Sequence, residues 1–451
     1  MTRPLDIAII GGGISGLGAA HRLAQRHRVT LFEAADYVGG HTHTVDATVG
    51  GVTHPVDTGF LVFNERTYPQ LIALFESLGV PVAASDMSFS VSVGPHEFEW
   101  CGSDLRSVFA QPANALSPRF WWMLADILRF NRQATALARD PSRASDAGVP
   151  LGQWLDAQRY GRPFREGYLL PMAAAIWSCP VDAMLAFPAG SFARFCDNHG
   201  LLQVADRPRW FTVAGGARQY VERIVPGLHQ VRTGTPVRGV LREPPGAAGR
   251  PAGTVTVITD HGRERFDEVV LACHSDQSLA LLLDASDDER SVLGAVPYQP
   301  NRAYLHTDLA LMPRRRRAWA SWNYLSRGRF GGPAGVQAAG GPSVAVTYWL
   351  NRLQPLPFAE PVLVTLNPPA PPREDRTLGV YDYSHPVFDG GALLAQRRLP
   401  ALQGLRHTWY AGAWTGWGFH EDGLKSGLAV AGALLASTDA DAAPTLLAAA
   451  A

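Results

Sequence analysis

A glycine-rich segment near the start of the chain has the residue types and the spacing of a dinucleotide-binding turn. Gly11, Gly13 and Gly16 form the pattern G-x-G-x-x-G, directly after the apolar run 7–10. In such a turn the first glycine permits a tight bend, the second lets the backbone approach a pyrophosphate, and the third lets a helix pack against a strand. The N–H groups at the helix start would bind the phosphates, and we place Ser15 in the same site.

The neighbouring elements that must position these glycines form a predicted βαβ unit. The pattern predicts a strand over 7–10, a helix over 17–26 and a second strand over 29–32, which ends in Glu33. A carboxylate at this point would accept hydrogen bonds from a ribose and would repel a 2′-phosphate. We therefore expect NAD or FAD, and not NADP, in this site.

The segment that follows distinguishes these two cofactors by resemblance. Glu33 is followed, after five residues, by Gly39, Gly40, His41 and Thr42. This segment resembles the one after the second strand in the superfamily of flavin amine oxidases, protoporphyrinogen oxidases and phytoene desaturases. The resemblance implies FAD as the cofactor, with these four residues beneath its pyrophosphate. That superfamily usually has an arginine at the position of His41.

Three further segments resemble cofactor-binding parts of the same superfamily. The segment of Gly59 and Phe60 is similar to the acid-x-glycine segment beside the isoalloxazine ring, which implies that both residues contact the flavin. Residues 211–275 resemble the second cofactor segment, in which Val237 would lend backbone groups to the adenine. Residues 408–435 resemble the C-terminal signature. This last resemblance implies FAD contacts from the following residues: Gly412, Glu421, Asp422 and Gly423.

The order of the predicted elements and the resemblance together imply an α/β fold. We expect a Rossmann-like FAD-binding domain of the glutathione-reductase type, amine oxidase subfamily, with a discontinuous α+β substrate domain. The predicted boundaries are 1–75, 205–285 and 400–440 for the FAD-binding domain, 76–204 and 286–399 for the substrate domain, and 441–451 for a flexible tail.

The composition argues against several classes of protein. The chain of 451 residues has 40 basic and 40 acidic residues, so its formal charge is zero and we expect no nucleic-acid binding. The four cysteines form no C-x-x-C pair, and we expect no metal site. No apolar run has the length of a membrane span, and no signal sequence is evident. We therefore expect a cytoplasmic protein, either soluble or peripheral at the inner membrane surface.

Two segments bear on contact with a membrane. Residues 120–139 are predicted to form a long helix, with Phe120, Trp121 and Leu128 near one face. This helix is either a core helix of the substrate domain or an amphipathic segment that rests on a membrane. Residues 314–317 are four consecutive arginines, which form either a solvated loop or a site that attracts anionic lipid headgroups. The sequence leaves both pairs of alternatives open.

Two reactions within the superfamily remain open, and the lysine content bears on the first. Amine oxidases typically place a lysine near the flavin, whereas Lys425 is the only lysine here and lies in the predicted C-terminal cofactor helix. Trp417 and Phe419 could cage an amine through cation–π contacts, although packing on the flavin explains them as well. Oxidation of a hydrophobic amine therefore stays as the alternative reaction.

The second reaction is desaturation of a hydrophobic substrate. Segments 39–42, 347–354 and 418–423 resemble a bacterial family of predicted NAD/FAD-binding proteins that accompany cyclopropane-fatty-acid-synthase-like methyltransferases. The resemblance implies desaturation of a methyl-branched fatty acyl chain of a phospholipid, on the way to a furan fatty acid, with a lipid methyltransferase as partner. A non-catalytic flavin-binding partner of that methyltransferase is a third hypothesis.

The candidate catalytic residues follow from the chemistry of dehydrogenation. Removing two hydrogens from a C–C bond needs a hydride acceptor and a base, and His420 is the candidate base because histidine titrates near neutrality. The alternative is that His420 only forms hydrogen bonds with the flavin or the loop. Tyr348 and Asn351 are predicted to line the substrate pocket.

Overall fold

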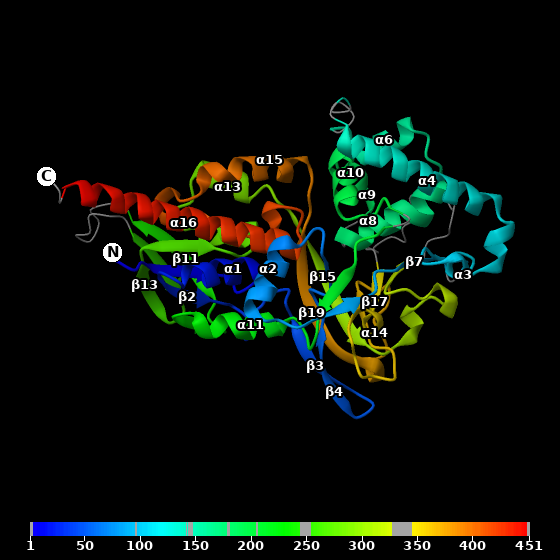
Figure 1. Ribbon diagram of the computed structural model, residues 1–451, viewed down its shortest axis with the longest axis horizontal. Coiled ribbons are helices and arrows are strands. Elements are labelled where there is room, and N and C mark those ends of the chain that lie inside the picture. Colours follow the sequence, from blue (N-terminus) through cyan, green and yellow to red (C-terminus); the bar gives the residue numbers. More distant parts are fainter. Residues whose placement is uncertain are drawn as a thin grey trace.

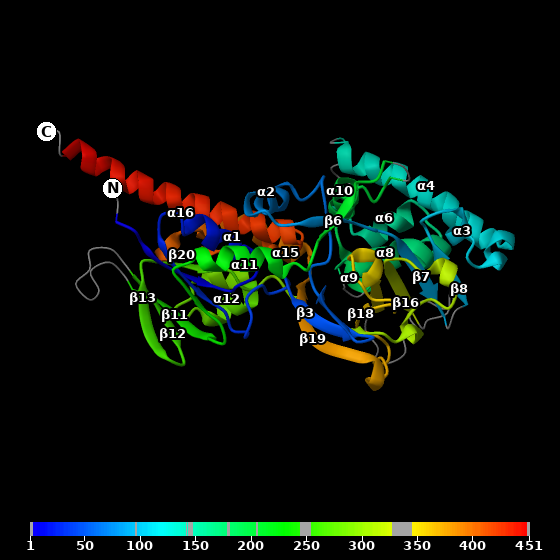
Figure 2. The ribbon, with the colours of Figure 1, turned by 60° about the horizontal axis from the view of Figure 1, so that its bottom comes forward.

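The computed structural model describes residues 3–94, 97–140, 142, 148–177, 181–203, 206–243, 254–326 and 345–448. Figure 1 shows the two termini at one end of the long axis, and helices α3 (Leu105–Val108) and α4 (Pro118–Arg139) at the other end. The turned view in Figure 2 shows the same separation of the molecule into two halves. Each half is built on its own large sheet.

A five-stranded parallel sheet lies at the centre of the half that carries the termini. Its strand order is β10-β2-β1-β14-β20. Alternate residues of β1 pack into two different buried clusters, so both faces of this strand are covered. Burial on both faces is the reason for its continuously apolar sequence. The bounds are β1 (Asp6–Ile10), β2 (Arg28–Phe32), β10 (Gln230–Arg232), β14 (Glu268–Leu271) and β20 (Thr408–Tyr410). A three-stranded sheet packs nearby. Its strands are β11 (Val237–Glu243), β12 (Thr254–Thr259) and β13 (Gly262–Phe266).

Helices α1 (Ile14–Leu23) and α16 (His420–Ala448) pack closely against each other beside this sheet. Glycine permits the contact, since a Cβ at Gly427 would lie 2.1 Å from the carbonyl oxygen of Ser15. Helix α16 continues through Ala448 and so includes residues 441–448 of the tail predicted from the sequence. The end of that predicted tail, 449–451, lies outside the described residues.

A seven-stranded mixed sheet forms the core of the other half. Its order is β19-β15-β18-β17-β16-β7-β8; β16 and β7 are parallel, and the other neighbours are antiparallel. The strands are β7 (Phe89–Val93), β8 (Phe98–Cys101), β15 (Tyr298–His306), β16 (Trp322–Ser326), β17 (Ala345–Trp349), β18 (Leu363–Leu366) and β19 (Thr377–Pro386). Besides α3 and α4, the helices of this half include α6 (Leu151–Ala157), α7 (Arg162–Phe164), α8 (Leu170–Trp177), α9 (Val181–Ala186) and α10 (Ala189–Asn198).

Helix α4 packs on this half through one face only. The residues of its buried face recur at intervals of three, four or seven positions, as on one side of a helix: Phe120, Met123, Phe130, Ala134 and Leu137. Trp121 and Leu128, which the sequence analysis placed with Phe120, are 51% and 60% exposed. They lie seven residues apart, on the side of the helix that faces solvent. The helix is therefore a core helix that also presents large apolar side chains outward.

Asp57 ties the two halves together at the end of a hairpin of β3 (Thr44–Val49) and β4 (Val52–Asp57). Its carboxylate accepts hydrogen bonds from Gln354 Nε2 at 2.5 Å and from the N–H of Ala217 at 2.9 Å. Gln354 follows α14 (Leu350–Leu353), and Ala217 precedes α11 (Arg218–Ile224). Burial raises the pKa of Asp57 to about 6, although the hydrogen bonds oppose that shift.

One further sheet and four more α-helices belong to the described residues. The sheet has three strands in the order β5-β9-β6. Their bounds are β5 (Phe63–Asn64), β6 (Val82–Ser85), β9 (Trp210–Val213), α2 (Pro69–Leu78), α12 (Ser275–Leu281), α13 (Asp287–Leu293) and α15 (Gly390–Arg398), besides α14. Helix α2 ends at Gly79 in the left-handed conformation, φ +62°.

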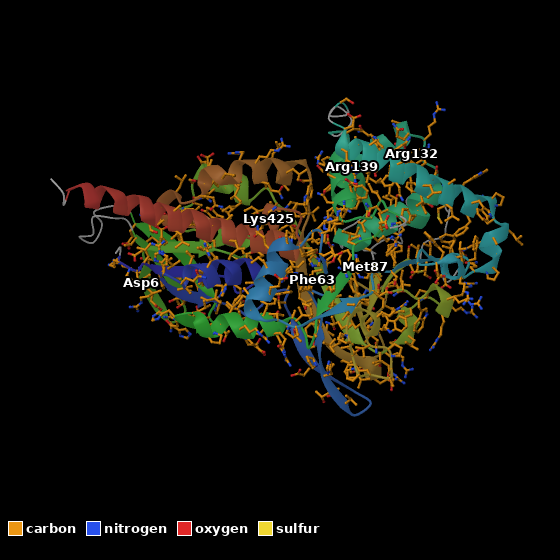
Figure 3. The ribbon with its side chains drawn as sticks, in the orientation of Figure 1. Asp6, Phe63, Met87, Arg132, Arg139 and Lys425 are labelled. Carbon is orange, nitrogen blue, oxygen red and sulfur yellow. The ribbon has the colours of Figure 1, made fainter. Side chains whose placement is uncertain are left out.

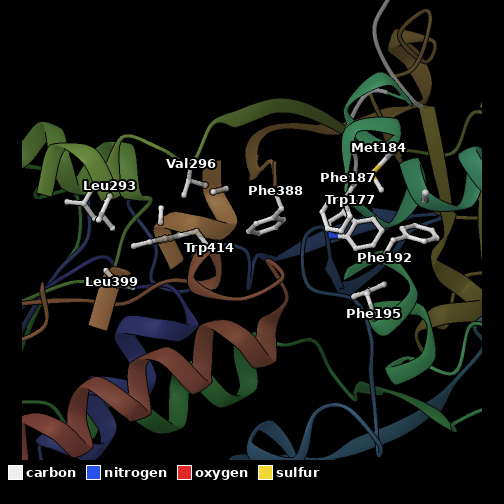
Figure 4. Packing of buried hydrophobic residues seen from close by; sticks show 14 of the residues in the cluster. Trp177, Met184, Phe187, Phe192, Phe195, Leu293, Val296, Phe388, Leu399 and Trp414 are labelled. Carbon is white, nitrogen blue, oxygen red and sulfur yellow. The ribbon is translucent and has the colours of Figure 1, made fainter. Parts of the chain in front are cut away.

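One buried hydrophobic cluster runs from one half to the other. Figure 4 shows its members from helices α8 and α10 on one side, those from the region of α13 on the other, and one phenylalanine between them: Trp177, Phe195, Leu293, Val296 and Phe388. Because the cluster is continuous, the two halves share a packed core. This core fixes the shape of the space that they enclose.

A buried charge network joins three elements of the half that carries the termini. The guanidinium of Arg242 on β11 is 1% exposed and contacts Glu289 on α13 at 2.5 Å. It also contacts Asp284 at 2.7 Å. Tyr410 on β20 donates its hydroxyl to Glu289 at 2.6 Å. Burial alone would raise the pKa of Glu289, but hydrogen bonds from Arg242 and Tyr410 lower it to about 2.

We predict that Glu289→Gln lowers the free energy of unfolding at pH 7 by about 1.5–3 kcal/mol, because the buried Arg242 guanidinium then keeps only Asp284 as an ionised partner. The ionised Glu289 stabilises the fold above its ordinary pKa of 4.5, and this contribution is lost as the pH falls through about 2. Urea unfolding should therefore show a difference between wild type and variant that shrinks over this range. As a control, Asp260→Asn removes a pair in which both side chains are 57% exposed and should change stability little. Equal losses in the two variants would contradict this account.

Candidate active site

A cavity of about 1210 Å³ lies between the two halves, at the carboxyl ends of β1, β2 and β14. This edge of a parallel sheet is where α/β proteins bind their ligands. Met87, labelled in Figure 3 between the two halves, belongs to the lining. Lys425 is exposed on α16 and does not line the cavity, so the chain's one lysine lies outside it.

The glycine turn after β1 has the geometry that a pyrophosphate site requires. Gly11 has φ +107°, and a Cβ at Gly16 would lie 1.9 Å from the Gly11 carbonyl oxygen. A Cβ at Gly13, by contrast, would meet no atom within 4 Å. Gly11, Gly13 and Ser15 all line the cavity. The N–H groups at the start of α1 therefore have open space in which to bind phosphate oxygens.

Glu33 and Val237 lie in the part of the lining next to this turn. The Glu33 carboxylate accepts backbone hydrogen bonds from Gly12 at 2.7 Å and from Ala35 at 2.9 Å. These bonds hold the carboxylate at the cavity wall, and its oxygens retain further acceptor capacity. The positions of Glu33 and Val237 suit the ribose and adenine contacts, which stay predictions.

The segment after Glu33 packs against the glycine turn. Gly39 forms a parallel bridge with Gly13, and Gly40 adopts φ +59°. Gly40 and His41 line the cavity. The Nε2 atom of His41 is buried and has no hydrogen-bond partner among the described residues. Because an unpaired buried polar atom is costly, a cofactor atom beside it would satisfy a need that the chain leaves open.

Gly59, Phe60 and His420 form a compact group at the cavity wall. A Cβ at Gly59 would lie 2.2 Å from a backbone carbonyl oxygen, so only glycine fits there. The ring of Phe60 stacks on that of His420, with centroids 3.9 Å apart and planes 10° from parallel. The Nε2 atom of His420 lies 2.9 Å from the Tyr220 hydroxyl and 3.3 Å from the Thr42 hydroxyl.

This environment bears on His420 as the candidate base. Burial lowers the pKa of His420 to about 3, so the ring is neutral at physiological pH and would hold an abstracted proton weakly. Its Nε2 already faces Tyr220 and Thr42, which also hydrogen-bond to each other. The geometry favours the alternative of a hydrogen-bonding role, and the catalytic role of His420 stays a prediction.

The structure separates the two predicted pocket residues. Tyr348 on β17 lines the cavity and lies edge-on to Trp322, with ring centroids 4.7 Å apart. Asn351 does not line it, contrary to the sequence analysis. The Asn351 amide donates to two carbonyls of the loop 358–362 at 3.2 and 3.1 Å and accepts the N–H of Val362 at 2.7 Å. Its polar groups are used to hold that loop.

Three residues of the C-terminal signature are engaged in packing and are absent from the described lining of the cavity, so their cofactor contacts stay predictions. Glu421 accepts hydrogen bonds at 3.0 and 2.9 Å from two N–H groups in the first turn of α2. Asp422 accepts two N–H groups of the loop 417–419 at 3.1 and 3.0 Å. A Cβ at Gly423 would lie 2.8 Å from the Ile14 side chain, so this glycine permits the contact of α16 with α1.

The other predicted cofactor residues divide in the same way. Gly412 lines the cavity, whereas Gly16, Gly39 and Thr42 lie behind its wall. A Cβ at Gly39 would lie 2.3 Å from the Thr42 carbonyl oxygen, so Gly39, like Gly16, is required by close backbone packing. The Thr42 hydroxyl is bonded within the chain, as described above. These residues shape the wall, which for Gly16 is the packing role predicted from the sequence, and the cofactor contacts of Gly39 and Thr42 stay predictions.

Three histidines of the lining were missed because no local motif contains them: His199, His274 and His385. His199 follows α10, His274 follows β14 and His385 lies in β19, so only the fold brings them to one cavity. Burial lowers the pKa of His199 and of His385 to about 4, and it lowers that of His274. Like His41 and His420, these rings are neutral at physiological pH.

Two features are absent from the residues that the structure describes. Within those ranges, no three or more histidine, cysteine, aspartate or glutamate side chains are grouped so that they could hold a metal ion. In the same part of the chain, no helix is both long enough and apolar enough to cross a membrane.

Comparisons with known sequences identify relatives. The family model described as flavin containing amine oxidoreductase matches residues 14–311. Carotenoid phi-ring synthase of Streptomyces griseus is 28% identical over 327 residues, which cover 67% of this chain and 57% of that protein. Coproporphyrinogen III oxidase of Mycobacterium tuberculosis is 41% identical over 81 residues, or 17% of each protein. The matched segments thus span 57% of the length of the first relative and 17% of the length of the second.

Solved structures share the fold. Cyclohexylamine oxidase from Brevibacterium oxydans IH-35A has a TM-score of 0.68 at 16% identity, over 97% of this chain and 100% of that one. A CLA-producing fatty acid isomerase from P. acnes has a TM-score of 0.63 at 16% identity, over 95% and 98%. These likenesses confirm the predicted fold class. The chain belongs to the flavin containing amine oxidoreductase family, and its cofactor is FAD.

Proposed function

We propose that this protein is an FAD-dependent oxidoreductase that desaturates a methyl-branched fatty acyl chain of a phospholipid. The observation that carries the proposal is the apolar wall of the cavity away from the glycine turn. Its members include Ile176, Trp177, Phe195, Trp322, Leu366 and Phe388. A wall of this kind favours a hydrocarbon chain, because each apolar surface buries the other from water. The fold is also that of a fatty acid isomerase in P. acnes, so it can accommodate a fatty acyl substrate.

The charges at the cavity support an uncharged substrate. The described lining has two carboxylates, Glu33 and Asp382. Glu33 accepts backbone N–H groups, and Asp382 is paired with Arg302 at 2.7 Å. Both carboxylates of the described lining thus have partners within the chain, and they would offset the desolvation of an ammonium group less than an unpaired carboxylate would.

The chain's own residues divide the work in this proposal. The turn of Gly11 and Gly13, with Glu33 and His41, would hold the cofactor, and FAD when bound supplies the hydride acceptor. The apolar wall excludes water and aligns the acyl chain. Stacking on Phe60 and the hydrogen bond with the Tyr220 hydroxyl hold the His420 ring in one orientation at that wall.

Oxidation of a hydrophobic amine is the second candidate, because Trp417 and Phe419 both line the cavity. Phe419 is stacked on Phe195 with centroids 5.1 Å apart, so it already has a packing role. A lipid methyltransferase as partner is proposed from the sequence resemblance alone. The same holds for the third hypothesis, in which the protein binds flavin as a non-catalytic partner of that methyltransferase.

The first test is anaerobic bleaching of the flavin in the purified protein. Phospholipids that bear methyl-branched acyl chains should bleach the visible spectrum and gain a double bond, detected by mass spectrometry. Phospholipids with straight saturated chains serve as the control for the branch, and a panel of hydrophobic amines tests the second candidate. Bleaching by amines alone would replace the acyl proposal, and bleaching by no substrate would favour the non-catalytic role.

We predict that Gly13→Val abolishes flavin retention without unfolding the protein. The new side chain meets no protein atom near its Cβ and occupies the space of the pyrophosphate, so the variant should keep less than about a tenth of the wild-type flavin. Gly227→Val is the matched control, since Gly227 is exposed and also has open space at its Cβ. Absorbance at 450 nm per protein and circular dichroism give the two readouts. A Gly13→Val protein that stays yellow would show that the turn is misplaced.

We predict that His420→Ala retains FAD and slows anaerobic flavin reduction by less than about tenfold, whereas loss of a general base typically costs about 10²–10⁴-fold. The pKa of about 3 also predicts no inflection from His420 in the wild-type rate at neutral pH. Stopped-flow absorbance checks both points, with Tyr220→Phe as a companion that keeps the ring and removes its partner. A drop of a hundredfold or more in His420→Ala alone would restore His420 as the base.

A further inference from the structure

Large apolar side chains are exposed on α3, on α4 and between them. Figure 1 shows these helices at the end of the molecule away from the termini. We call these residues the α3–α4 patch. Its members and their exposed fractions are Leu105 (78%), Leu116 (88%), Trp121 (51%), Trp122 (67%) and Leu128 (60%). None of them lines the cavity. Exposed tryptophan and leucine gathered at one end of a protein mark a surface for interaction.

Contacts along the chain make the patch continuous. The indole of Trp121 donates its N–H to the Ala115 carbonyl at 2.9 Å, within the short helix η1 (Pro112–Leu116). The same ring lies 5.6 Å from that of Phe109, the residue directly after α3. Leu128 is two turns further along the exposed side of α4. The patch therefore extends from α3 through η1 to the first half of α4.

Basic side chains surround the patch, although the whole chain has a formal charge of zero. The exposed arginines of these elements and of the neighbouring basic run are Arg106, Arg119, Arg132, Arg314, Arg316 and Arg317. Figure 3 labels Arg132, which projects from α4. Asp104 and Asp126 are the acids of the segment 104–132, and Asp126 is paired with Arg129 at 2.9 Å. The balance of charge around the patch is positive.

The basic run is held beside α3 by a buried acid. Glu99 on β8 is fully buried and accepts the N–H groups of Arg314 at 2.7 Å and Arg315 at 3.1 Å. It also contacts the Arg315 side chain at 2.9 Å. The short helix η7 (Arg316–Ala318) then packs against α3. The fold thus holds the arginines next to exposed leucines. A freely solvated loop would not need a buried acid to hold it in place.

We propose that the α3–α4 patch docks this protein on an anionic lipid surface. Tryptophan side chains suit the headgroup level, leucine side chains reach the acyl region, and arginines pair with lipid phosphates. A second copy of the chain is a poorer occupant. In a two-fold symmetric contact the patch would meet itself, and the surrounding arginines would face one another. The proposal concerns a surface outside the cavity and does not depend on the reaction proposed above.

The test is flotation of the FAD-loaded protein with vesicles of phosphatidylcholine that contain about one-third phosphatidylglycerol, and with pure phosphatidylcholine vesicles. Binding should require the anionic lipid and weaken as salt rises. Trp122→Ser with Leu116→Ser should weaken it by at least about tenfold, and Arg316→Gln with Arg317→Gln by about fivefold for each arginine. The matched controls lie on α15: Leu394→Ser, at a side chain 62% exposed, and Arg397→Gln.

Flavin absorbance confirms that each variant is folded, and analytical ultracentrifugation reports its assembly state. Absence of binding to the anionic vesicles would overturn the proposal, and so would equal losses in the patch and control variants. A concentration-dependent dimer that Trp122→Ser dissociates, with vesicle binding unchanged, would assign the patch to a second copy. Because no readout uses turnover, failure here is distinct from failure of the acyl substrate in the bleaching test.

Discussion

The close approach of backbone to backbone at the turn between β1 and α1 is the constraint on which the rest of the site depends. A Cβ at Gly16 would lie only 1.9 Å from the carbonyl oxygen of Gly11. Helix α1 can begin directly at the cavity because Gly16 has no such atom. Helix α16 approaches α1 for the same reason at Gly427. The result is a helix start whose N–H groups face open space at Gly13. The glycines behind the wall matter as much as Gly13, which faces the cavity.

The half that carries the termini was predictable because its signals are local. Glycine spacing, an apolar run and one acid at the end of a strand specify β1, α1 and β2 within a few residues. The limits of resemblance also show here. It placed Glu421 and Asp422 in the right loop and helix, but their carboxylates bind the first turn of α2 and the loop before α16. A motif transfers the position of a residue better than the direction of its side chain.

The other half was less predictable because its elements are defined by contacts distant in sequence. Strand β19 contains polar residues and ends in proline, and it is a strand because it pairs along β15. The apolar face of α4 was misjudged at Trp121, since a helix with large apolar residues on two sides has no single stripe. His385 reaches the cavity only through that same β19 pairing. No spacing in the sequence brings it near His41, although their rings lie 5.1 Å apart.

The electrostatics of the cavity connect these observations. Burial keeps the lining histidines neutral, since desolvation penalises the imidazolium and the neighbouring rings repel further charge at His41. The carboxylates Glu33 and Asp382 already have partners. A wall with neutral histidines and paired carboxylates distinguishes substrates mainly by shape and apolar area, and it offers little acid–base assistance near neutral pH. In such a cavity, catalysis depends on the cofactor and on the alignment of the substrate. This suits a hydrocarbon chain, because packing along its length sets its position. It suits a small cation poorly.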